Sequence, residues 1–560
     1  MKSCVLLLRI LPFLLLPTLL PAAEEAPATS TAKVVDLRVE SQTNPTAVNT
    51  PLPRFSWRIE TEERGWLQKS YHILVASTPE LLAQDKGDLW DSGEVLGRTS
   101  QFVSFGGIPL LSGQQIHWKV RSKDTKGTLT GWSLNSHAEI QLSGPASLPF
   151  APFPADAQRI SSFESSSSSL NHLYAAAAER LSELTGVRDV GLVMRAAGYH
   201  VALVPQPRNW VTSFQLSVDA AGFYPAHLPA DGSFGSTQSD AGVQSAYALW
   251  WMTGDNAYLD RFWPTINAYG VARRSVDPDA VGLPFGTIPA DSLPEGDNTP
   301  AEFLHLTSQA LTIRLMLHMG KQSSRNGFEI RALNSYFAKL GENFHTSHLL
   351  PDGSLRYNSL TAHVLALRCG LLGTVEEQTP VAQGLLRLLS KENAPSPFED
   401  SPLVATNILP VLTWIGKHDL GLKLAQAQDP DSLSPIALAA ISEWLISIQA
   451  GINSELPGFQ SLQIQPRFPD GTSLTFCKAE FTSSFGLVLT HSWIESGQVH
   501  FDLTIPPNTT AFVRLPCAAG QALTEGGKPI DTTFPAFVRE DSFVTFRCLS
   551  GTFHFVVQTK

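Results

Sequence analysis

The spacing of apolar residues changes twice along this chain, and this change constrains the fold more than any other feature. Between residues 170 and 451 apolar residues recur at helical spacing in one segment after another. On both sides of this region they alternate with polar residues in short runs bounded by glycine, proline and aspartate, which is typical of antiparallel strands. The sequence therefore predicts a β domain, an α-helical domain and a second β domain, in that order.

The helical region contains strongly apolar segments separated by short polar, glycine or proline loops. These segments are LNHLYAAAAERLSEL, VQSAYALWWMTGD, FLHLTSQALTIRLMLHM, LTAHVLALRCGLL, VATNILPVLTWIG and IALAAISEWLISI. A helical hairpin cannot bury its apolar face alone, so a series of hairpins must close into a toroid or stack as a solenoid. No fixed sequence period is present, which favours a closed α/α toroid over residues 169–455.

The flanking regions are predicted to be β-sandwiches, at residues 32–145 and 456–560. A stretch rich in proline and serine, residues 146–168, is interpreted as a linker between the first sandwich and the toroid. Tryptophans recur among the N-terminal strands, at Trp57, Trp90, Trp118 and Trp132. We expect them to pack in the core, because aromatic residues dominate such cores, although a platform for stacking on sugars is the alternative.

The first residues have the pattern of a secretory signal peptide. Lys2 and Arg9 accompany an apolar stretch through Leu20, and the small residues Ala22 and Ala23 follow it. We therefore expect residues 1–25 to be removed and the mature protein to be secreted or periplasmic, with no membrane span. An uncleaved membrane anchor is the alternative interpretation.

Charge and composition narrow the class of ligand. The chain is 43% hydrophobic and 16% charged, which is typical of a globular protein. Its formal net charge is −11 and it has no long basic run. This balance argues against nucleic acids or anionic membranes as partners and favours neutral ligands.

The cysteines give no indication of a metal or cofactor. Cys369, Cys477, Cys517 and Cys548 show neither CxxC spacing nor a pairing with histidines. We expect neither a metal site nor any other cofactor. The last three cysteines lie in the C-terminal β region, where an oxidising compartment would allow one disulfide whose pairing the sequence does not determine.

Several stretches carry a resemblance to a known family. The N-terminal region contains NPTAVNTPLPRFSWRI, YHILVAS, DLWDSGEV and IHWKVRSKD followed by GWS, and later stretches include SDAGVQSAYALWWMTGD, ILPVLTWIGKHDLGLKLAQ and AISEWLISIQAGI leading to LPGFQSLQIQP. In this order they resemble bacterial α-L-rhamnosidases of glycoside hydrolase family 78. The resemblance implies a fibronectin-type first domain and a six-hairpin toroid. The chain is shorter than is usual in that family, and the β domain that normally precedes the toroid is missing.

The resemblance implies an inverting hydrolysis of terminal α-L-rhamnosides. Such a reaction needs a protonated carboxyl group to protonate the leaving oxygen and a carboxylate to activate water, about 6.5–9.5 Å apart. The family's acid lies in a motif of the form DCPQRDERLGW, which aligns with DVGLVMRAAGY at Asp189 to Tyr199. The position of the acid is occupied by Arg195, and a guanidinium cannot donate a proton at any working pH.

Two further family motifs are changed. The base belongs to a GATTxWE segment, but only AQDPDSLSPIAL separates LGLKLAQ from AISEWLI, so the segment is deleted. Glu443 lies nearby and is interpreted as a helix residue, with a relocated base as the alternative. The family's FGDW loop is represented by FGTI from Phe285 to Ile288, which lacks the acidic and aromatic sugar contacts.

Other acidic residues leave an alternative open, because a diverged enzyme could draw a new carboxylate pair from them. These residues are Asp219, Asp231, Asp240, Asp291, Glu295 and Asp297. Each is also explained as a loop or helix-capping carboxylate, since aspartate favours turns and helix starts. Asp240 is the best single candidate, because it matches a family position at the predicted start of a helix.

For substrate binding we predict aromatic and acidic side chains at the mouth of the toroid. Tyr199, Trp210 and Trp250 would stack on a sugar face, and Asp189 and Asp240 would accept hydroxyl protons. Packing in the helical core is the alternative for Trp250. No residue is assigned a catalytic or metal-binding role.

Two hypotheses about function follow. We favour a secreted rhamnosidase-like protein that has lost catalysis and retains at most the binding of a rhamnose-containing glycan or another neutral carbohydrate. The alternative is an active α-L-rhamnosidase or related inverting glycosidase that uses a rearranged pair of carboxylates. The two hypotheses differ in whether two carboxyl groups face each other across the toroid cavity.

Overall fold

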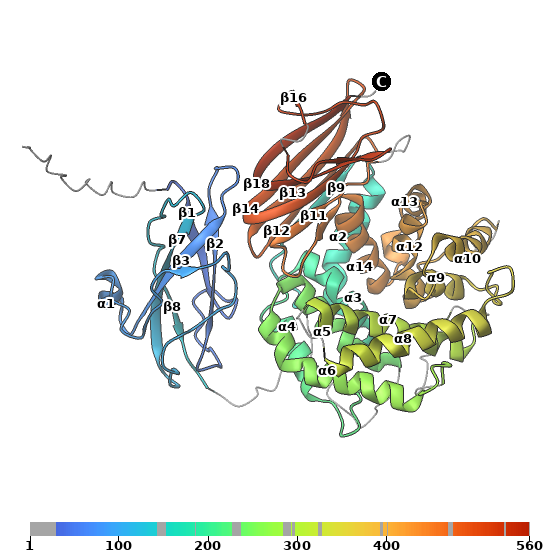
Figure 1. Cartoon of the computed structure of the whole chain (residues 1–560), viewed down its shortest axis with the longest axis horizontal. Helices are drawn as coiled ribbons and strands as arrows, with labels where there is room; N and C mark the ends of the chain where they lie inside the picture. The colour runs from blue at the N-terminus through green and yellow to red at the C-terminus, as the bar shows by residue number, and fades with distance from the viewer. Residues whose placement is uncertain are drawn as a thin grey trace, which may run out of the picture.

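The computed structural model describes residues 30–142, 153–184, 186–226, 237–283, 293, 297–322, 327–391, 396–399, 401–468, 474–530 and 534–558. An N-terminal β domain, a ring of helices and a C-terminal β domain follow one another along the chain (Figure 1). This architecture confirms the predicted fold class. The predicted signal peptide lies outside the described residues. No helix among these residues is long and apolar enough to cross a membrane.

The N-terminal domain consists of two antiparallel sheets. One sheet contains β1 (Lys33–Val39), β2 (Arg54–Glu60) and β6 (Val103–Ser104); the other contains β3 (Gln68–Ala76), β4 (Trp90–Asp91), β5 (Val95–Leu96), β7 (Gln115–Asp124) and β8 (Ser136–Glu139), with the short helix α1 (Pro79–Ala83) after β3. Trp57 and Trp118 are fully buried and Trp90 packs against the same core, as predicted. Trp132 is partly buried and packs against a small separate core cluster, and the cationic groups of Lys119 and Arg121 lie 5.0 and 4.5 Å from its ring centre.

The helical domain is a closed ring built from helical hairpins. The inner helices are α3 (Val187–His200), α5 (Ala241–Thr253), α7 (Ala301–Gln322), α9 (Leu360–Cys369), α11 (Pro402–Ala405) with α12 (Ile408–Trp414), and α14 (Pro435–Trp444). The outer helices are α2 (Ser168–Arg180), α4 (Gln206–Leu216), α6 (Asn256–Val276), α8 (Phe328–His348), α10 (Val375–Leu389) and α13 (His418–Gln426). Each inner helix contacts the next, and α14 contacts α3, so the ring closes. The predicted toroid is confirmed.

Glycines allow two of the inner helices to lie unusually close together. A Cβ atom on Gly191 of α3 would lie 2.5 Å from the Cβ atom of Ala241 on α5, and one on Gly198 would lie 2.8 Å from Cγ of Met252. Such separations are shorter than van der Waals contact, so larger residues here would push α3 away from α5. The small residues at the end of the aligned DVGLVMRAAGY stretch would suit a turn, but α3 continues through Gly198 to His200.

The predicted linker at residues 146–168 is only partly correct, because it contains a strand. Residues Ser161–Ser165 form β9, which pairs antiparallel with β12 (Phe476–Ser483) of the C-terminal domain. Phe163 and Ser165 point inward and are buried, whereas their neighbours are more exposed. The proline and serine content marks the end of the first domain, but it does not reveal so short an edge strand. Residues 143–152 lie outside the described residues.

The C-terminal domain is a network of hydrogen-bonded strands that includes β9. Its other strands are β10 (Ile452–Ser454), β11 (Ser461–Ile464), β12, β13 (Gly486–Glu495), β14 (Gln498–Pro516), β15 (Leu523–Glu525), β16 (Lys528–Pro529), β17 (Val538–Arg539) and β18 (Phe543–Gln558). The long strands β14 and β18 pair on both sides of an irregularity between Ile505 and Thr510. Such an irregularity bends the ribbon, so β14 can pair with β13 before it and β11 after it.

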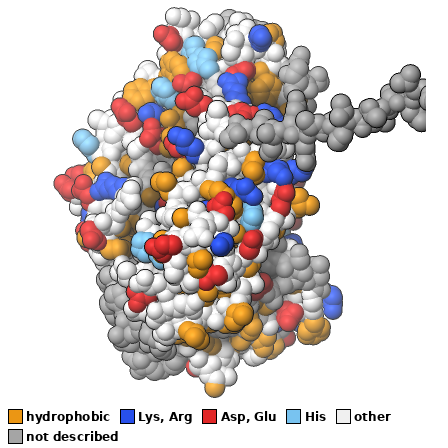
Figure 2. All heavy atoms as spheres, turned by 90° about the vertical axis from the view of Figure 1, so that its left-hand side faces the viewer, with side chains coloured by type: hydrophobic (Ala, Val, Ile, Leu, Met, Phe, Trp, Pro, Cys, Tyr) orange, Lys and Arg blue, Asp and Glu red, His pale blue; other side chains and the backbone are white. Residues whose placement is uncertain are grey.

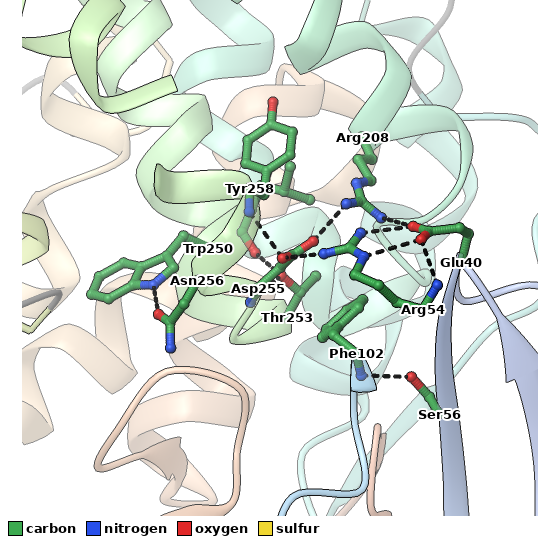
Figure 3. Close-up of polar contacts among 11 residues, drawn as sticks. Glu40, Arg54, Ser56, Phe102, Arg208, Trp250, Thr253, Asp255, Asn256 and Tyr258 are labelled. Carbon is green, nitrogen blue, oxygen red and sulfur yellow. Dashed lines mark hydrogen bonds and ion pairs between the residues drawn. The ribbon is translucent and has the colours of Figure 1, made fainter. Parts of the chain in front are cut away.

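A network of charged side chains joins the N-terminal domain to the ring (Figure 3). Arg54 of β2 pairs with Glu40 at 2.7 Å and with Asp255 at 2.6 Å, and Arg208 of α4 pairs with Asp255 at 2.6 Å. Asp255 also caps α6 by accepting a hydrogen bond from the backbone nitrogen of Tyr258. Burial opposes the charge of Arg54, but Glu40 and Asp255 outweigh it and raise the pKa of this guanidinium.

The N-terminal domain also contacts the C-terminal domain. Asn508 accepts a hydrogen bond from the backbone of Gln68 and donates to the carbonyl of Arg98, and the Ser550 hydroxyl donates to the carbonyl of Trp66. On the side of the molecule formed by the N-terminal domain, acidic, basic and apolar side chains are interspersed (Figure 2). The first domain is therefore held by both of its neighbours.

The cysteines of the described region are all unpaired thiols in the protein interior. Cys369, Cys477, Cys517 and Cys548 are buried and none forms a disulfide. Burial raises the pKa of Cys369 to about 11 and that of Cys477 to about 12. The disulfide that the sequence would allow among the three C-terminal cysteines is not present in this structure.

His200, at the end of α3, predicts that acid destabilises the protein. It is buried, its Nε2 lies 2.8 Å from Oγ of Ser442, and burial lowers its pKa from 6.5 to about 3. The unfolded chain therefore takes up a proton near pH 6.5 that the folded protein takes up only near pH 3. We expect His200 to contribute its full stabilisation above pH 6.5 and to lose about 1.4 kcal/mol per pH unit below it.

Urea unfolding between pH 7.5 and 4.5 tests this expectation in the wild type and His200→Gln. The glutamine variant should be less stable at pH 7.5, but its stability should fall less steeply with acid because it lacks the titrating group. Equal slopes in the two proteins would show that folding does not lower the pKa of His200.

Candidate functional site

The ring encloses a cavity of about 1000 Å³ on its axis. Side chains from all of the inner helices line it, and α8 and α10 contribute at its edge. Inner helices of a closed ring point one face toward the axis, so residues far apart in the sequence meet there. A concave site of this size can enclose a saccharide of more than one unit.

Arg195, at the position that the resemblance assigns to an acid, points into this cavity from α3. It forms an ion pair with Glu443 of α14 across the junction where the ring closes. Burial opposes the charge of Arg195, but Glu443 and nearby tyrosines outweigh it and raise its pKa. Glu443 is a helix residue, as predicted, but it also lines the cavity, which sequence reasoning did not anticipate.

Asp240 lies at the start of α5, as predicted, and it also lines the cavity. Its side chain does not cap the helix. Oδ1 accepts a hydrogen bond of 2.6 Å from the hydroxyl of Tyr269, and Oδ2 accepts a very short one from Ser308. Asp240 is 2% exposed, so both of its oxygens are held by protein donors in a buried position.

The predicted aromatic sugar contacts are not at the cavity, and this part of the prediction needs correction. Tyr199, Trp210 and Trp250 are 1%, 4% and 1% exposed and belong to the hydrophobic core. The Tyr199 hydroxyl donates to the carbonyl of Ile452, and the Trp250 indole donates to Asn256. Large aromatic side chains on both inner and outer helices fill the space between the helix layers, so core packing, the alternative for Trp250, describes all three.

Asp189 lies in the first turn of α3, where its Oδ1 accepts a hydrogen bond of 2.8 Å from Nε of Arg188. Arg188 lines the cavity, whereas Asp189 is not among the lining residues. Of the other acidic candidates, Asp219 and Asp297 accept hydrogen bonds from nearby backbone nitrogens and so stabilise turns. Asp231, Asp291, Glu295 and the Phe285–Ile288 segment lie outside the described residues.

Sequence reasoning missed the basic and aromatic side chains that line the cavity. Arg314 on α7, Arg368 on α9 and Lys321 on α7 contribute positive charge, and Tyr247 and Trp414 contribute rings. Burial, together with the charges of Arg195 and Arg314, lowers the pKa of Arg368 to about 10, so it remains protonated at neutral pH. Arginines within the apolar stretches FLHLTSQALTIRLMLHM and LTAHVLALRCGLL were the signal that could have identified them.

The described part of the chain contains no cluster of three or more histidine, cysteine or acidic residues that could hold a metal ion. Its cavity lining contains two carboxylates, Asp240 and Glu443, and both already have protein partners. The cavity therefore offers hydrogen-bond donors, fixed positive charge and aromatic rings. These groups are suited to binding oxygen-rich ligands.

Each domain matches a family model of the same group of proteins. Residues 34–143 match the Rha78A-like, N-terminal immunoglobulin domain, residues 179–433 match the bacterial alpha-L-rhamnosidase 6 hairpin glycosidase domain, and residues 451–528 match the bacterial alpha-L-rhamnosidase C-terminal domain. The order of the matches is the order of the domains observed in the structure.

Curated relatives agree with these matches over parts of their length. An alpha-L-rhamnosidase of Streptomyces avermitilis is 24% identical over 417 residues, which are 66% of this chain and 38% of the relative. An alpha-L-rhamnosidase of Formosa agariphila is 34% identical over 104 residues, 19% of this chain and 11% of the relative. The matched residues therefore correspond to about two fifths of the Streptomyces avermitilis protein and about one tenth of the Formosa agariphila protein.

Solved structures share the fold. The alpha-L-rhamnosidase from Dictyoglumus thermophilum superposes with a TM-score of 0.82 at 12% identity, covering 96% of this chain and 100% of that one. The Streptomyces avermitilis alpha-L-rhamnosidase complexed with L-rhamnose gives a TM-score of 0.80 at 14% identity, covering 94% and 100%. With three domain matches in sequence and the same fold throughout, the chain belongs to the α-L-rhamnosidase-like proteins of glycoside hydrolase family 78.

Proposed function

We propose that this chain is a secreted, rhamnosidase-like protein that binds carbohydrate in its axial cavity and does not hydrolyse glycosides. The proposal rests chiefly on Arg195. This residue occupies the aligned position of the general acid, and its guanidinium is held by Glu443 inside the cavity. A permanently charged group at this position cannot protonate a leaving oxygen, and protonation is the step on which inverting hydrolysis depends.

The connection between α13 and α14 supports the same proposal. It spans residues 427–434 and includes a short 3-10 turn at Pro430–Ser432. The resemblance places the base-bearing segment in this connection, and so short a link leaves no room for it. Retained binding is supported by the cavity, which is open to solvent and lined by Trp414, a ring that is 50% exposed.

One observation favours a second candidate, an active glycosidase with rearranged carboxylates. Asp240 and Glu443 line the same cavity from α5 and α14. In that case Glu443 would activate water and Asp240 would act as the acid. Against it, Tyr269 and Ser308 donate hydrogen bonds to the two oxygens of Asp240, so both oxygens already have protein partners.

A single set of assays separates the two candidates. We expect the purified mature protein to release no 4-nitrophenol from 4-nitrophenyl α-L-rhamnoside above the rate in buffer, whereas glycosidases accelerate such reactions by at least about 10⁶-fold. Calorimetric titration with L-rhamnose should still detect binding. Asp189→Asn, Asp240→Asn and Glu443→Gln should change no hydrolysis rate. Turnover that Asp240→Asn or Glu443→Gln abolishes would refute the proposal and support the second candidate.

A further inference from the structure

The cavity wall is far more positive than the chain as a whole. The lining residues include the cations Arg188, Arg195, Arg314, Arg368 and Lys321 against the carboxylates Asp240 and Glu443. The whole chain, by contrast, has a formal net charge of −11. The amino-acid composition of the whole chain therefore does not explain the positive charge of the cavity wall.

Two of these cations have their charge balanced by an adjacent carboxylate. Arg188 pairs with Asp189 at 2.8 Å, and Arg195 pairs with Glu443. These pairs lie on α3 and between α3 and α14, on one side of the ring. These two pairs do not balance the charges of the arginines on α7 and α9.

Arg314 and Arg368 have no ion-pair partner among the described residues, although both are held in place. Nη1 of Arg314 donates a hydrogen bond of 2.8 Å to the carbonyl of Arg368, and Nε of Arg368 donates one of 3.0 Å to Oδ1 of Asn407. Carbonyl and amide oxygens orient a guanidinium, but they do not neutralise it. Both side chains line the cavity.

Keeping these two like charges together is unfavourable for the folded protein. Both side chains are half-buried, and partial burial of unpaired charges, together with the repulsion between Arg314 and Arg368, lowers stability. Apolar residues of similar size at these two positions would pack the ring without this penalty. Residues that lower stability without a structural partner are characteristic of binding sites.

The rest of the wall suits a sugar. Tyr247 and Trp414 present aromatic rings, and Gln244 presents an amide group, which hydrogen-bonds to hydroxyls. A ligand that bound both the arginines and the aromatic and amide groups would combine an oxyanion with a sugar ring. Guanidinium groups match the two oxygens of such an anion with paired N–H donors.

We infer that the cavity binds a saccharide bearing an oxyanion, a carboxylate or a sulfate ester, and that Arg314 and Arg368 bind this anion. The inference rests on the proposed carbohydrate binding and specifies its ligand as an acidic sugar rather than a neutral one.

Calorimetric titration of the full-length mature protein at low salt tests the inference. The probes are D-glucuronate, D-glucose 6-sulfate, the neutral sugars D-glucose and L-rhamnose, and inorganic sulfate. We expect at least one acidic sugar to bind about tenfold or more tightly than D-glucose, and to bind more weakly as salt is added. The acidic sugar that binds identifies the anion as carboxylate or sulfate.

Variants connect the binding to the two arginines. Arg314→Gln and Arg368→Gln should each weaken binding of the acidic sugar about tenfold or more, and should weaken binding of D-glucose much less. Arg514→Gln is the matched control, because Arg514 pairs with Glu540 in the C-terminal domain, outside the cavity. Thermal unfolding provides a second measurement: Arg368→Gln should melt no lower than the wild type, and the acidic sugar should raise the melting temperature of the wild type but not of the variant.

The outcomes separate this inference from the function on which it rests. Neutral and acidic sugars that bind equally, with no effect of either arginine variant, would overturn the inference and leave carbohydrate binding intact. Inorganic sulfate that binds as tightly as the acidic sugars would show an anion site with no sugar specificity, and this too would overturn it. If no sugar bound at all, carbohydrate binding itself would be refuted.

Discussion

Asp255→Ala is expected to destabilise the protein by about 3–5 kcal/mol and to loosen the N-terminal domain from the ring. Asp255 is 3% exposed and pairs with both Arg54 and Arg208. Its removal leaves two largely buried guanidinium groups sharing Glu40 alone, and it also removes the cap of α6. The measurements are urea unfolding of the variant and limited proteolysis, which should release the N-terminal domain faster than in the wild type.

A second substitution at Asp255 separates the effect of its charge from that of the helix cap, and a variant elsewhere serves as the control. Asp255→Asn keeps an oxygen to cap α6 but removes the charge, so its stability should exceed that of the alanine variant by about 1 kcal/mol, the usual contribution of a cap. Glu525→Ala is the control, because it removes another interdomain pair, with Arg64, that is much more exposed. We expect this control to lose less than about 1 kcal/mol. An Asp255→Ala variant as stable as the control would show that the network does not hold the domains together.

Glu443→Gln is expected to destabilise the protein by about 2–3 kcal/mol at low salt. Glu443 is the ion-pair partner of Arg195, and its charge also opposes the repulsion around Arg368. Without it, the described cavity wall retains one carboxylate, Asp240, whose oxygens are already occupied. Urea unfolding in low salt measures the loss, and about 0.5 M sodium chloride should restore part of it, because salt screens repulsion between the arginines.

Glu455→Gln serves as the control for this prediction. Glu455 pairs with Arg547 in the C-terminal domain, and both side chains are about one third exposed. Exposed pairs contribute about 0–1 kcal/mol, so this variant should unfold almost as the wild type does. A Glu443→Gln variant that unfolds like this control, or one that salt does not restore, would contradict the role assigned to Glu443 in balancing the cavity charge.

The sequence predicted the inner helices better than the outer ones, for a physical reason. An inner helix is covered on nearly all sides, so α5, α9 and α14 appear in the sequence as continuous apolar stretches. Outer helices expose one face and carry charges there, as α8 does, and α6 contains Pro264, which is usually a sign of a helix end. The α3 helix was not among the predicted helical segments, because its residues were considered only as the counterpart of the family's acid motif.

The candidate site could be predicted only in part. Asp240 was placed correctly because a helix start is a local feature, which short sequence patterns reveal. The Arg195–Glu443 pair joins residues 248 positions apart, from the first and last inner helices. No local pattern shows which of many charged residues on different helices point to one axis. For the same reason the aromatic residues of the core could not be distinguished from aromatic residues of the cavity.

The pairing of β9 with β12 has a consequence for how the chain folds. β9 precedes the whole ring, and β12 follows it, so the helical domain is an insertion between two adjacent strands of one sheet. Ring closure likewise joins α14 to α2 and α3, at the opposite end of the same insertion. Contacts between such distant segments form slowly, because the long intervening chain must first be brought together. During synthesis the ring cannot close until α14 emerges, and β9 cannot join its sheet until β12 emerges after α14. Closure of the ring is therefore expected to precede completion of the sheet.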